Sequence, residues 1–247
     1  MSNFTSEIDF NPQYIKETMY STGRYSYEDT MSSLICENPS MLLVLSRFAI
    51  TLGQGDKTID EVCVAHGVDT YTFLSVVNLL VTDTLPDDQN KVLPLSLLKY
   101  LEKSHEYFIS YRLPDIRRKL SDALCDTTAV ISKVIMDYFD EYVKGVKEHM
   151  GYEETVVFPY VRKICGDDTE LNKYHIDIFK DHHDNIDELL SELKDIIIKY
   201  YPAGINFSMS DALFDIYSCS EDLALHAKVE DMLLVPAVKN IELSHKR

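Results

Sequence analysis

Two thirteen-residue segments in the C-terminal half of the chain share one frame of metal-binding residue types. Each begins with histidine, places glutamate at +4 and a second acid at +5, and continues with aliphatic residues at +7 and +8, proline at +10 and valine at +12. Histidine and glutamate four positions apart lie on one face of a helix, so each pair can reach one metal ion or two adjacent ions. One HxxxE match is a weak signal, but a repeated frame is a stronger one. It predicts the metal ligands His149 and Glu153 in HMGYEETVVFPYV, and His226 and Glu230 in HAKVEDMLLVPAV.

A single histidine precedes each segment at nearly the same interval. His105 lies 44 residues before His149, and His183 lies 43 residues before His226. If each interval is a helix that runs out to a turn and a second helix that returns, each leg is roughly 30 Å long and both histidines lie at the same height. His105 and His183 therefore complete a predicted set of six ligands. His182 competes with His183, and the interval favours His183.

Four imidazoles and two carboxylates suit divalent or trivalent iron better than calcium or magnesium, which prefer oxygen ligands alone. Zinc usually takes four ligands, so a single zinc ion would leave two of the six unused. Ferritin-like sites combine a lone Glu on two helices with Glu-x-x-His on the other two, which is a different pattern. The set therefore predicts a non-haem di-iron centre, with two iron ions bridged by Glu153, Glu230 and an oxo or hydroxo group.

The distribution of turn-forming residues predicts the elements that hold these ligands. The chain has eight glycines and eight prolines, where average usage would give roughly 17 and 12, and this scarcity disfavours an all-β fold. Breaks near Cys125, at Gly166 and at Tyr201-Pro202 separate four expected helices, at about 95–123, 127–164, 169–200 and 208–240. Long helices with short connections predict an all-α, up-down-up-down four-helix bundle over residues 94–247.

Residues 1–93 are expected to form a smaller part that precedes the bundle. Residues 1–30 are polar and rich in tyrosine, and we expect an N-terminal arm there. The pattern of residues 31–93 predicts a small helical module followed by a linker. In this module Thr58 is placed to cap a short helix that stops at Gly67, and a second helix, capped by Asp69 or Thr70, is expected to run to about Val81.

The two short helices on either side of Gly67 also resemble a helix-turn-helix, which raises the hypothesis of a transcription regulator. The charge argues against it. The second helix contains no Lys or Arg, and residues 1–93 hold five basic and thirteen acidic residues. A DNA-binding protein needs cationic contacts to phosphates, so we expect no nucleic-acid partner.

The order His…HxxxE…His…HxxxE resembles the hemerythrin-like, or HHE cation-binding, domain. The details look like one subgroup, the Repair of Iron Centers family of di-iron proteins, over about 200 of the 247 residues. Both HxxxE segments are similar to that family's HxxxE(E)…(L/V)FP segments, and LEKSHEYFISYRLPDI around His105 is similar to its first ligand helix. His183-Asp184 followed by Glu188-Leu189-Leu190 is similar to its third ligand helix. Residues 40–80 are similar to its N-terminal module.

This resemblance implies protection or repair of iron–sulfur clusters damaged by nitric oxide or oxidants. It implies iron–sulfur proteins and a small gaseous ligand, nitric oxide or dioxygen, as partners, together with a homodimer. One departure matters: the family's Cys-Cys-Gly-Gly is replaced by Leu52-Gly53-Gln54-Gly55-Asp56, and Cys63 is the nearest thiol. This puts thiol-dependent activity and dimerisation in doubt. A di-iron oxygen- or nitric oxide-binding protein and a redox sensor stay open as alternatives. Oxygen-carrying hemerythrins have five histidines, so the four-histidine pattern favours redox or iron handling over oxygen storage.

Charge and cysteine usage predict the compartment. The formal net charge of −17 disfavours nonspecific binding to nucleic acid or to an anionic membrane. The N-terminus shows no basic region followed by an apolar stretch, and the apolar runs are far shorter than a membrane span. Five cysteines without a CxxC pair indicate reduced thiols. We therefore expect a cytoplasmic protein without a membrane partner.

Overall fold

The computed structural model describes residues 23–125, 127–166, 174–180, 186–202 and 207–245. The fold is all-α, and the regular elements of the described residues are helices, apart from one isolated β-bridge between Thr30 and Thr58. The contacts divide the chain into two units, Met1–Thr84 and Leu85–Arg247. Within the described residues, no helix is both long and apolar enough to cross a membrane.

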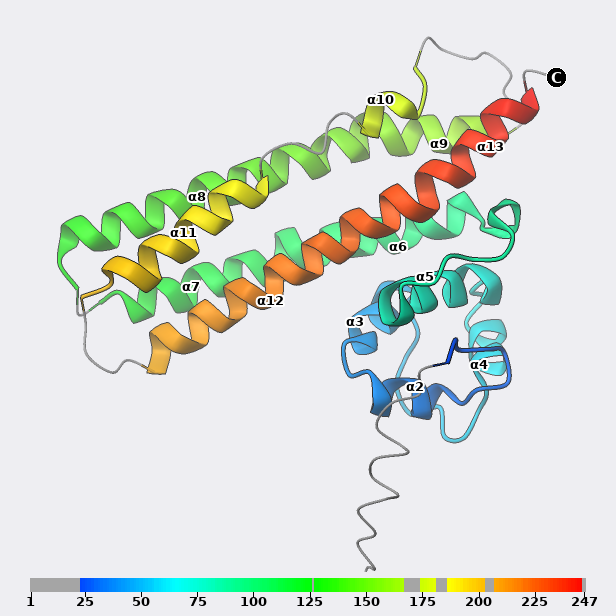
Figure 1. Cartoon of the computed structure of the whole chain (residues 1–247), viewed down its shortest axis with the longest axis horizontal. Helices are drawn as coiled ribbons and strands as arrows, with labels where there is room; N and C mark the ends of the chain where they lie inside the picture. The colour runs from blue at the N-terminus through cyan, green and yellow to red at the C-terminus, as the bar shows by residue number, and fades with distance from the viewer. Residues whose placement is uncertain (1–22, 126, 167–173, 181–185, 203–206, 246–247) are drawn as a thin grey trace, which may run out of the picture. The chain divides into compact units, whose positions relative to one another are not determined.

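The N-terminal unit contains four helices among its described residues: α2 (Met31–Glu37), α3 (Met41–Arg47), α4 (Ile59–Ala65) and α5 (Thr70–Thr82) (Figure 1). The predicted helix starts and stop are confirmed. Thr58 forms a capping box with Glu61, Gly67 has a φ of +66°, and Asp69 caps α5. Most side chains of α5 are buried, so this helix is a core element of the unit.

Part of the predicted N-terminal arm packs onto the same unit. The backbone N–H of Tyr25 donates to Asn78 Oδ1 at 2.7 Å, and its carbonyl accepts from Asn78 Nδ2 at 3.0 Å. The carbonyl of Asp29 accepts from the N–H of Ile59 at 2.8 Å. Residues 23–30 are therefore attached to α4 and α5, and residues 1–22 lie outside the described residues.

The C-terminal unit is a four-helix bundle, as predicted. After a short 3₁₀ turn, η1 (Gln89–Lys91), its legs follow one another along the chain and run lengthwise beside each other (Figure 1). The first leg comprises α6 (Pro94–Tyr107), η2 (Phe108–Arg112) and α7 (Leu113–Ala123). The second comprises α8 (Ala129–Tyr152), η3 (Glu153–Val157) and α9 (Phe158–Cys165). The third is described at α10 (Asp177–Lys180) and α11 (Ile186–Tyr200). The fourth comprises α12 (Phe207–Val229), η4 (Glu230–Leu234) and α13 (Val235–His245).

Apolar faces hold the bundle together over one half of its length. α7 packs against α12, and α8 packs against α11. The shared core contains large side chains from all four legs that are nearly inaccessible to solvent, among them Phe108, Ile116, Phe139, Leu193 and Ile216. Burying a side chain of this size contributes about 1.5–3 kcal/mol, so this core is the main source of bundle stability.

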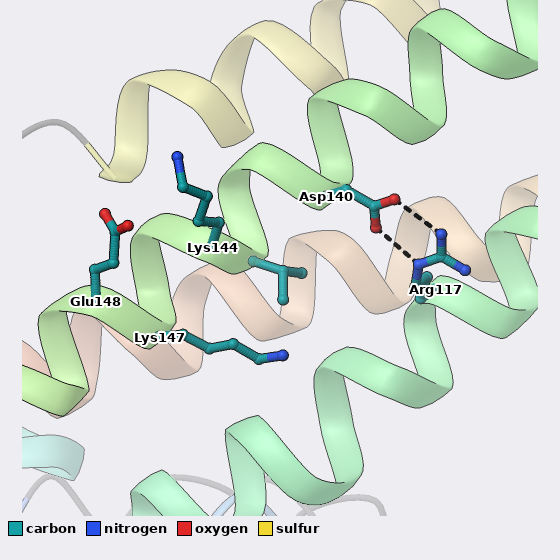
Figure 2. Close-up of a pocket in the computed structure, with 6 residues that line it drawn as sticks. Arg117, Asp140, Lys144, Lys147 and Glu148 are labelled. Atoms are coloured by element: carbon teal, nitrogen blue, oxygen red, sulfur yellow. Dashed lines mark hydrogen bonds and ion pairs between the residues drawn. The ribbon is translucent and has the colours of Figure 1, made fainter.

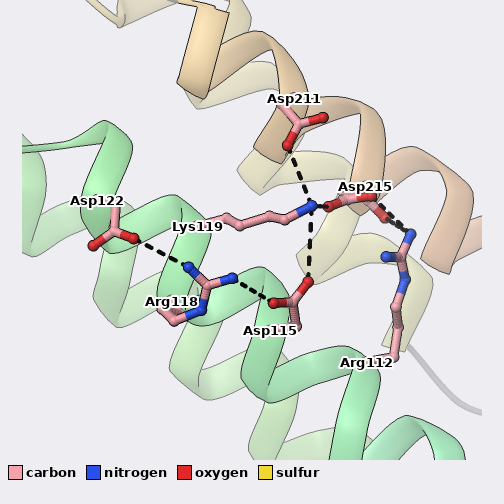
Figure 3. A network of polar contacts seen from close by, with 7 residues as sticks. All are labelled: Arg112, Asp115, Arg118, Lys119, Asp122, Asp211 and Asp215. Carbon is pink, nitrogen blue, oxygen red and sulfur yellow. Dashed lines mark hydrogen bonds and ion pairs between the residues drawn. The ribbon is translucent and has the colours of Figure 1, made fainter.

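Ion pairs connect the first leg to the second and fourth legs. Asp215 of α12 is contacted by the half-exposed Lys119 of α7 at 2.5 Å and by the more buried Arg112 of η2 at 3.0 Å (Figure 3). On α8, Asp140 accepts both hydrogen bonds of the Arg117 guanidinium at 2.7 and 2.8 Å, beside an open groove that Lys144 and Lys147 also line (Figure 2). The two pairs with Asp215 are less exposed than the Arg117–Asp140 pair, so they are the stronger constraint on helix position.

Candidate metal centre

Four of the six predicted ligands converge in the interior of the bundle. They are His105 of α6, Glu153 of η3, His226 of α12 and Glu230 of η4, and each offers one ligand atom within 4.8 Å of those of the other three. All four residues are buried, and both glutamates have no exposed surface. Helices from three legs of the bundle therefore bring imidazoles and carboxylates to one point.

The contacts within this cluster are close. Glu153 lies between two histidines, with Oε2 2.8 Å from His105 Nε2 and Oε1 2.9 Å from His149 Nε2. Glu230 Oε1 lies 3.1 Å from His226 Nε2. The predicted i, i+4 pairing of histidine with glutamate is therefore present on both helices.

The polar atoms at the centre fit a bound cation. Among the described residues, His105 Nε2, His226 Nε2 and both carboxylate oxygens of Glu153 are buried and make no hydrogen bond of acceptable geometry. A buried carboxylate or imidazole without a hydrogen bond loses its solvation without compensation. A metal ion would satisfy all of these atoms together, and imidazole with carboxylate is a donor set that iron accepts.

The surroundings of His105 favour a positive charge on its ring. Burial lowers the pKa of His105, but the neighbouring carboxylates of Glu153 and Glu154 raise it by more, with a further contribution from Glu230, so the net shift is upward. The raised pKa means that the protein surroundings of His105 favour positive charge there. A divalent or trivalent ion supplies that charge more completely than one proton.

A comparison with protein families matches residues 96–238 to the hemerythrin HHE cation-binding domain. The match spans more than half of the chain and contains all four clustered residues. The chain belongs to this family. Comparison with curated proteins gives no match. The chain therefore contains a cation-binding domain by family membership, and its buried cluster has donor atoms that could hold a metal ion.

In the described part of the HHE domain, three π-helical turns lie around the cluster. η2, η3 and η4 are each five residues long, and each is closed by a backbone N–H that donates to the carbonyl five residues earlier. In η3 and η4 the accepting carbonyl belongs to the ligand itself, Glu153 or Glu230. π-Turns of this kind are frequent at functional sites, and here they place each ligand glutamate at the point where the helix widens.

Prolines, two of them in the repeated frame, explain these turns. The donor of each π hydrogen bond is Leu113, Phe158 or Val235, and the next residue in each case is a proline. Proline has no N–H, and in a continuous α-helix its ring would clash with the carbonyl four residues earlier. The inserted π-turn accommodates the proline without ending the helix, so each leg continues in register beyond its ligand.

Aromatic side chains form the walls of the HHE site. Phe158 is fully buried and stacks on the His105 ring, with centroids 5.3 Å apart and an interplanar angle of 19°. Phe108 meets the His226 ring edge-on at 5.9 Å. The two imidazoles are 5.2 Å apart, so Phe108 and Phe158 enclose a pair of neighbouring histidines.

A cavity of about 330 Å³ reaches the cluster from one side and is called the His105 cavity below. Its lining includes Glu102, His105 and Glu106 from the first leg and Lys147, Met150 and Glu154 from the second. Glu106 and Glu154 at its rim are exposed, whereas His105 is buried. The cavity is thus a path between solvent and one ligand ring.

The other predicted ligands have separate outcomes. His149 lies outside the group of four but contacts Glu153, and its side chain is partly exposed. His183 and its competitor His182 lie outside the described residues, so the choice between them stays a prediction. Glu154 and Phe158 were not predicted to act at the site, although the acid at +5 of the repeated frame was a visible signal for Glu154.

Proposed function

We propose that this chain is a di-iron protein of the Repair of Iron Centers type, which protects or repairs iron–sulfur clusters under nitrosative or oxidative stress. The buried cluster of His105, Glu153, His226 and Glu230 carries the proposal. Its partners would be iron–sulfur proteins and nitric oxide or dioxygen. Membership in the HHE family and the resemblance of residues 40–80 to that group's N-terminal module support it.

The residues present define how two iron ions would be held. His105 and His149 flank Glu153, and His226 faces Glu230, so these residues would hold the ions, with His183 as the expected partner of the second pair and the two glutamates as the expected bridges. Bound iron supplies exchange between ferrous and ferric states and affinity for diatomic ligands. Phe108 and Phe158 cover the rings of His226 and His105, so fewer solvent molecules would compete there with the protein donors.

The proposal does not depend on thiol chemistry in the N-terminal unit. Cys63 is fully buried, and burial, with a smaller contribution from Asp60, raises the pKa of its thiol to about 12. A thiol with this pKa is almost entirely protonated at neutral pH and is a poor nucleophile. Cys63 therefore does not replace the Cys-Cys pair that the resembling family carries, and the proposed activity rests on the bundle.

Metal analysis after anaerobic reconstitution with ferrous iron is the direct test. We expect about two irons per chain, as in other di-iron carboxylate bundles. The double variant His149→Ala/His226→Ala should lose most of this iron, while His175→Ala, a substitution of an exposed histidine, should retain it. Wild-type protein without iron, or a double variant with full iron content, would contradict the di-iron assignment.

Repair is tested separately by reactivation of a [4Fe–4S] enzyme that nitric oxide has inactivated. Iron-loaded protein should restore its activity, and iron-free protein should not. A second candidate function, reversible binding of nitric oxide or dioxygen in a sensor, is favoured by the His105 cavity, because a diatomic molecule fits within it. Reversible gas binding without reactivation would select the sensor and reject repair.

A further inference from the structure

Glu154 is an exposed residue whose carboxylate contacts the buried imidazole ring of His105. Its Oε1 lies 3.0 Å from His105 Nδ1, and its side chain is 53% exposed, whereas that of His105 is 1% exposed. The two residues come from different legs of the bundle and are 49 positions apart in the chain. Neighbouring acids that line the same cavity have other partners: Glu102 pairs with Arg162, and Glu106 pairs with Lys103.

The hydrogen bond to Glu154 determines which His105 nitrogen faces the cluster. A carboxylate accepts hydrogen bonds, so Nδ1 must carry the proton and donate it. Nε2 is then left for the metal, and it is the nitrogen that lies 2.8 Å from Glu153 Oε2. A carboxylate behind a ligating histidine fixes its tautomer and orientation in many metal sites.

The stacking of Phe158 leaves one motion of His105 to be restrained. Parallel rings resist tilting, but the His105 ring can still turn within its own plane against Phe158. A hydrogen bond at Nδ1 opposes this in-plane rotation because it acts at the edge of the ring. Phe158 and Glu154 together therefore hold both the plane and the direction of the imidazole.

We infer that Glu154 is a positioning residue for His105, which directs Nε2 at the metal and controls how fast iron leaves the centre through the His105 cavity. The inference rests on the proposed di-iron function. The Glu154 side chain is exposed, so water and chelators can reach its hydrogen bond to His105.

Two measurements on wild type and four variants test this role. In ¹⁵N-labelled metal-free protein, the Nδ1–H of His105 should give a resonance that is protected from exchange with water, assigned by its loss in His105→Gln. Glu154→Leu should abolish the resonance, and Glu154→Gln should retain it, because the amide oxygen still accepts the bond. Glu106→Gln is the matched control, since Glu106 lines the same cavity and pairs with Lys103.

Iron release to a ferrous chelator is the second measurement. Glu154→Leu should release iron roughly 10- to 100-fold faster than wild type, the range seen when such supporting carboxylates are removed, with Glu154→Gln intermediate and Glu106→Gln unchanged. The inference is overturned if the wild-type resonance is absent, if it persists in Glu154→Leu, or if the release rate of that variant is unchanged. Wild-type protein that binds no iron would refute the di-iron function, while the proton resonance would still decide the role of Glu154.

Discussion

The two HxxxE segments have the same frame and the same π-turn, but they lie in different surroundings. In the first segment the His149 side chain is 14% exposed, and the neighbouring Glu154 lines the His105 cavity. In the second, the His226 side chain is 3% exposed, whereas the ligand glutamates of both segments are fully buried. The comparison teaches that a ligand frame determines which donors reach the metal, while the neighbouring helices determine how accessible each donor is.

Replacing each ligand glutamate in turn should give the largest effects. The two variants distinguish the iron affinity of a segment from the access of solvent to it. Glu153→Ala and Glu230→Ala are each expected to weaken iron binding by at least about 100-fold, because removing a ligand should exceed the effect of removing its supporting partner. Residual iron should leave Glu153→Ala faster than Glu230→Ala, since the more exposed of the two frame histidines, His149, belongs to the Glu153 segment. Iron content measures the affinity, and release to a chelator measures the rate. Equal release rates from the two variants would contradict the difference in accessibility between the segments.

The side chain at position +9 of the frame differs in size between the segments: it is Phe158 in the first and Val235 in the second. Phe158→Ala should lower the free energy of unfolding by about 3–5 kcal/mol, because it removes a fully buried ring that stacks on His105. Val235→Ala, at the equivalent position, should cost about 2 kcal/mol, because two buried methyl groups are lost. Urea unfolding of the metal-free proteins provides the measurement. Similar losses for both variants would show that Phe158 has no special packing role.

The ion pairs that attach α8 and α12 to the first leg of the bundle should contribute to stability in the order of their burial. Asp215→Ala on α12 leaves Arg112 and Lys119 without their shared carboxylate in a mostly buried setting, and we expect a loss of about 2 kcal/mol. Asp140→Ala on α8 breaks an exposed pair, whose contribution is roughly 0–1 kcal/mol. High salt should reduce only the smaller effect. A larger loss of unfolding free energy for Asp140→Ala than for Asp215→Ala would contradict the conclusion that the pairs with Asp215 are the stronger ones.

The prolines test whether the shared π-turns serve the metal. Pro159→Ala and Pro236→Ala restore an N–H to the helix and permit an ordinary α-helical register. We expect unchanged or increased thermal stability without metal, but iron affinity reduced by about tenfold or less, because the ligand glutamates lose the support of the π hydrogen bond. Thermal unfolding and iron titration, with Pro202→Ala as a control outside the π-turns, distinguish these effects.

Much of the bundle follows from local sequence signals. The predicted helices at about 95–123 and 127–164 correspond to legs of 94–123 and 129–165, because glycine, proline and capping residues end helices through local backbone constraints. The i, i+4 spacing of His149 with Glu153 and of His226 with Glu230 is likewise local geometry. The sequence did not allow the π-turns to be predicted, although a proline follows the donor residue of each one in the described structure.

The sequence by itself determined the helices, the two HxxxE faces and the chemistry of the donors, since these depend on contacts within a few residues. Only the tertiary structure decided that Glu154 faces His105 across 49 residues, that Phe158 stacks on the same ring, and that a cavity opens beside the first segment. These features depend on the rotation and separation of packed helices. Side-chain interdigitation over the whole core sets both quantities, and no short pattern encodes them.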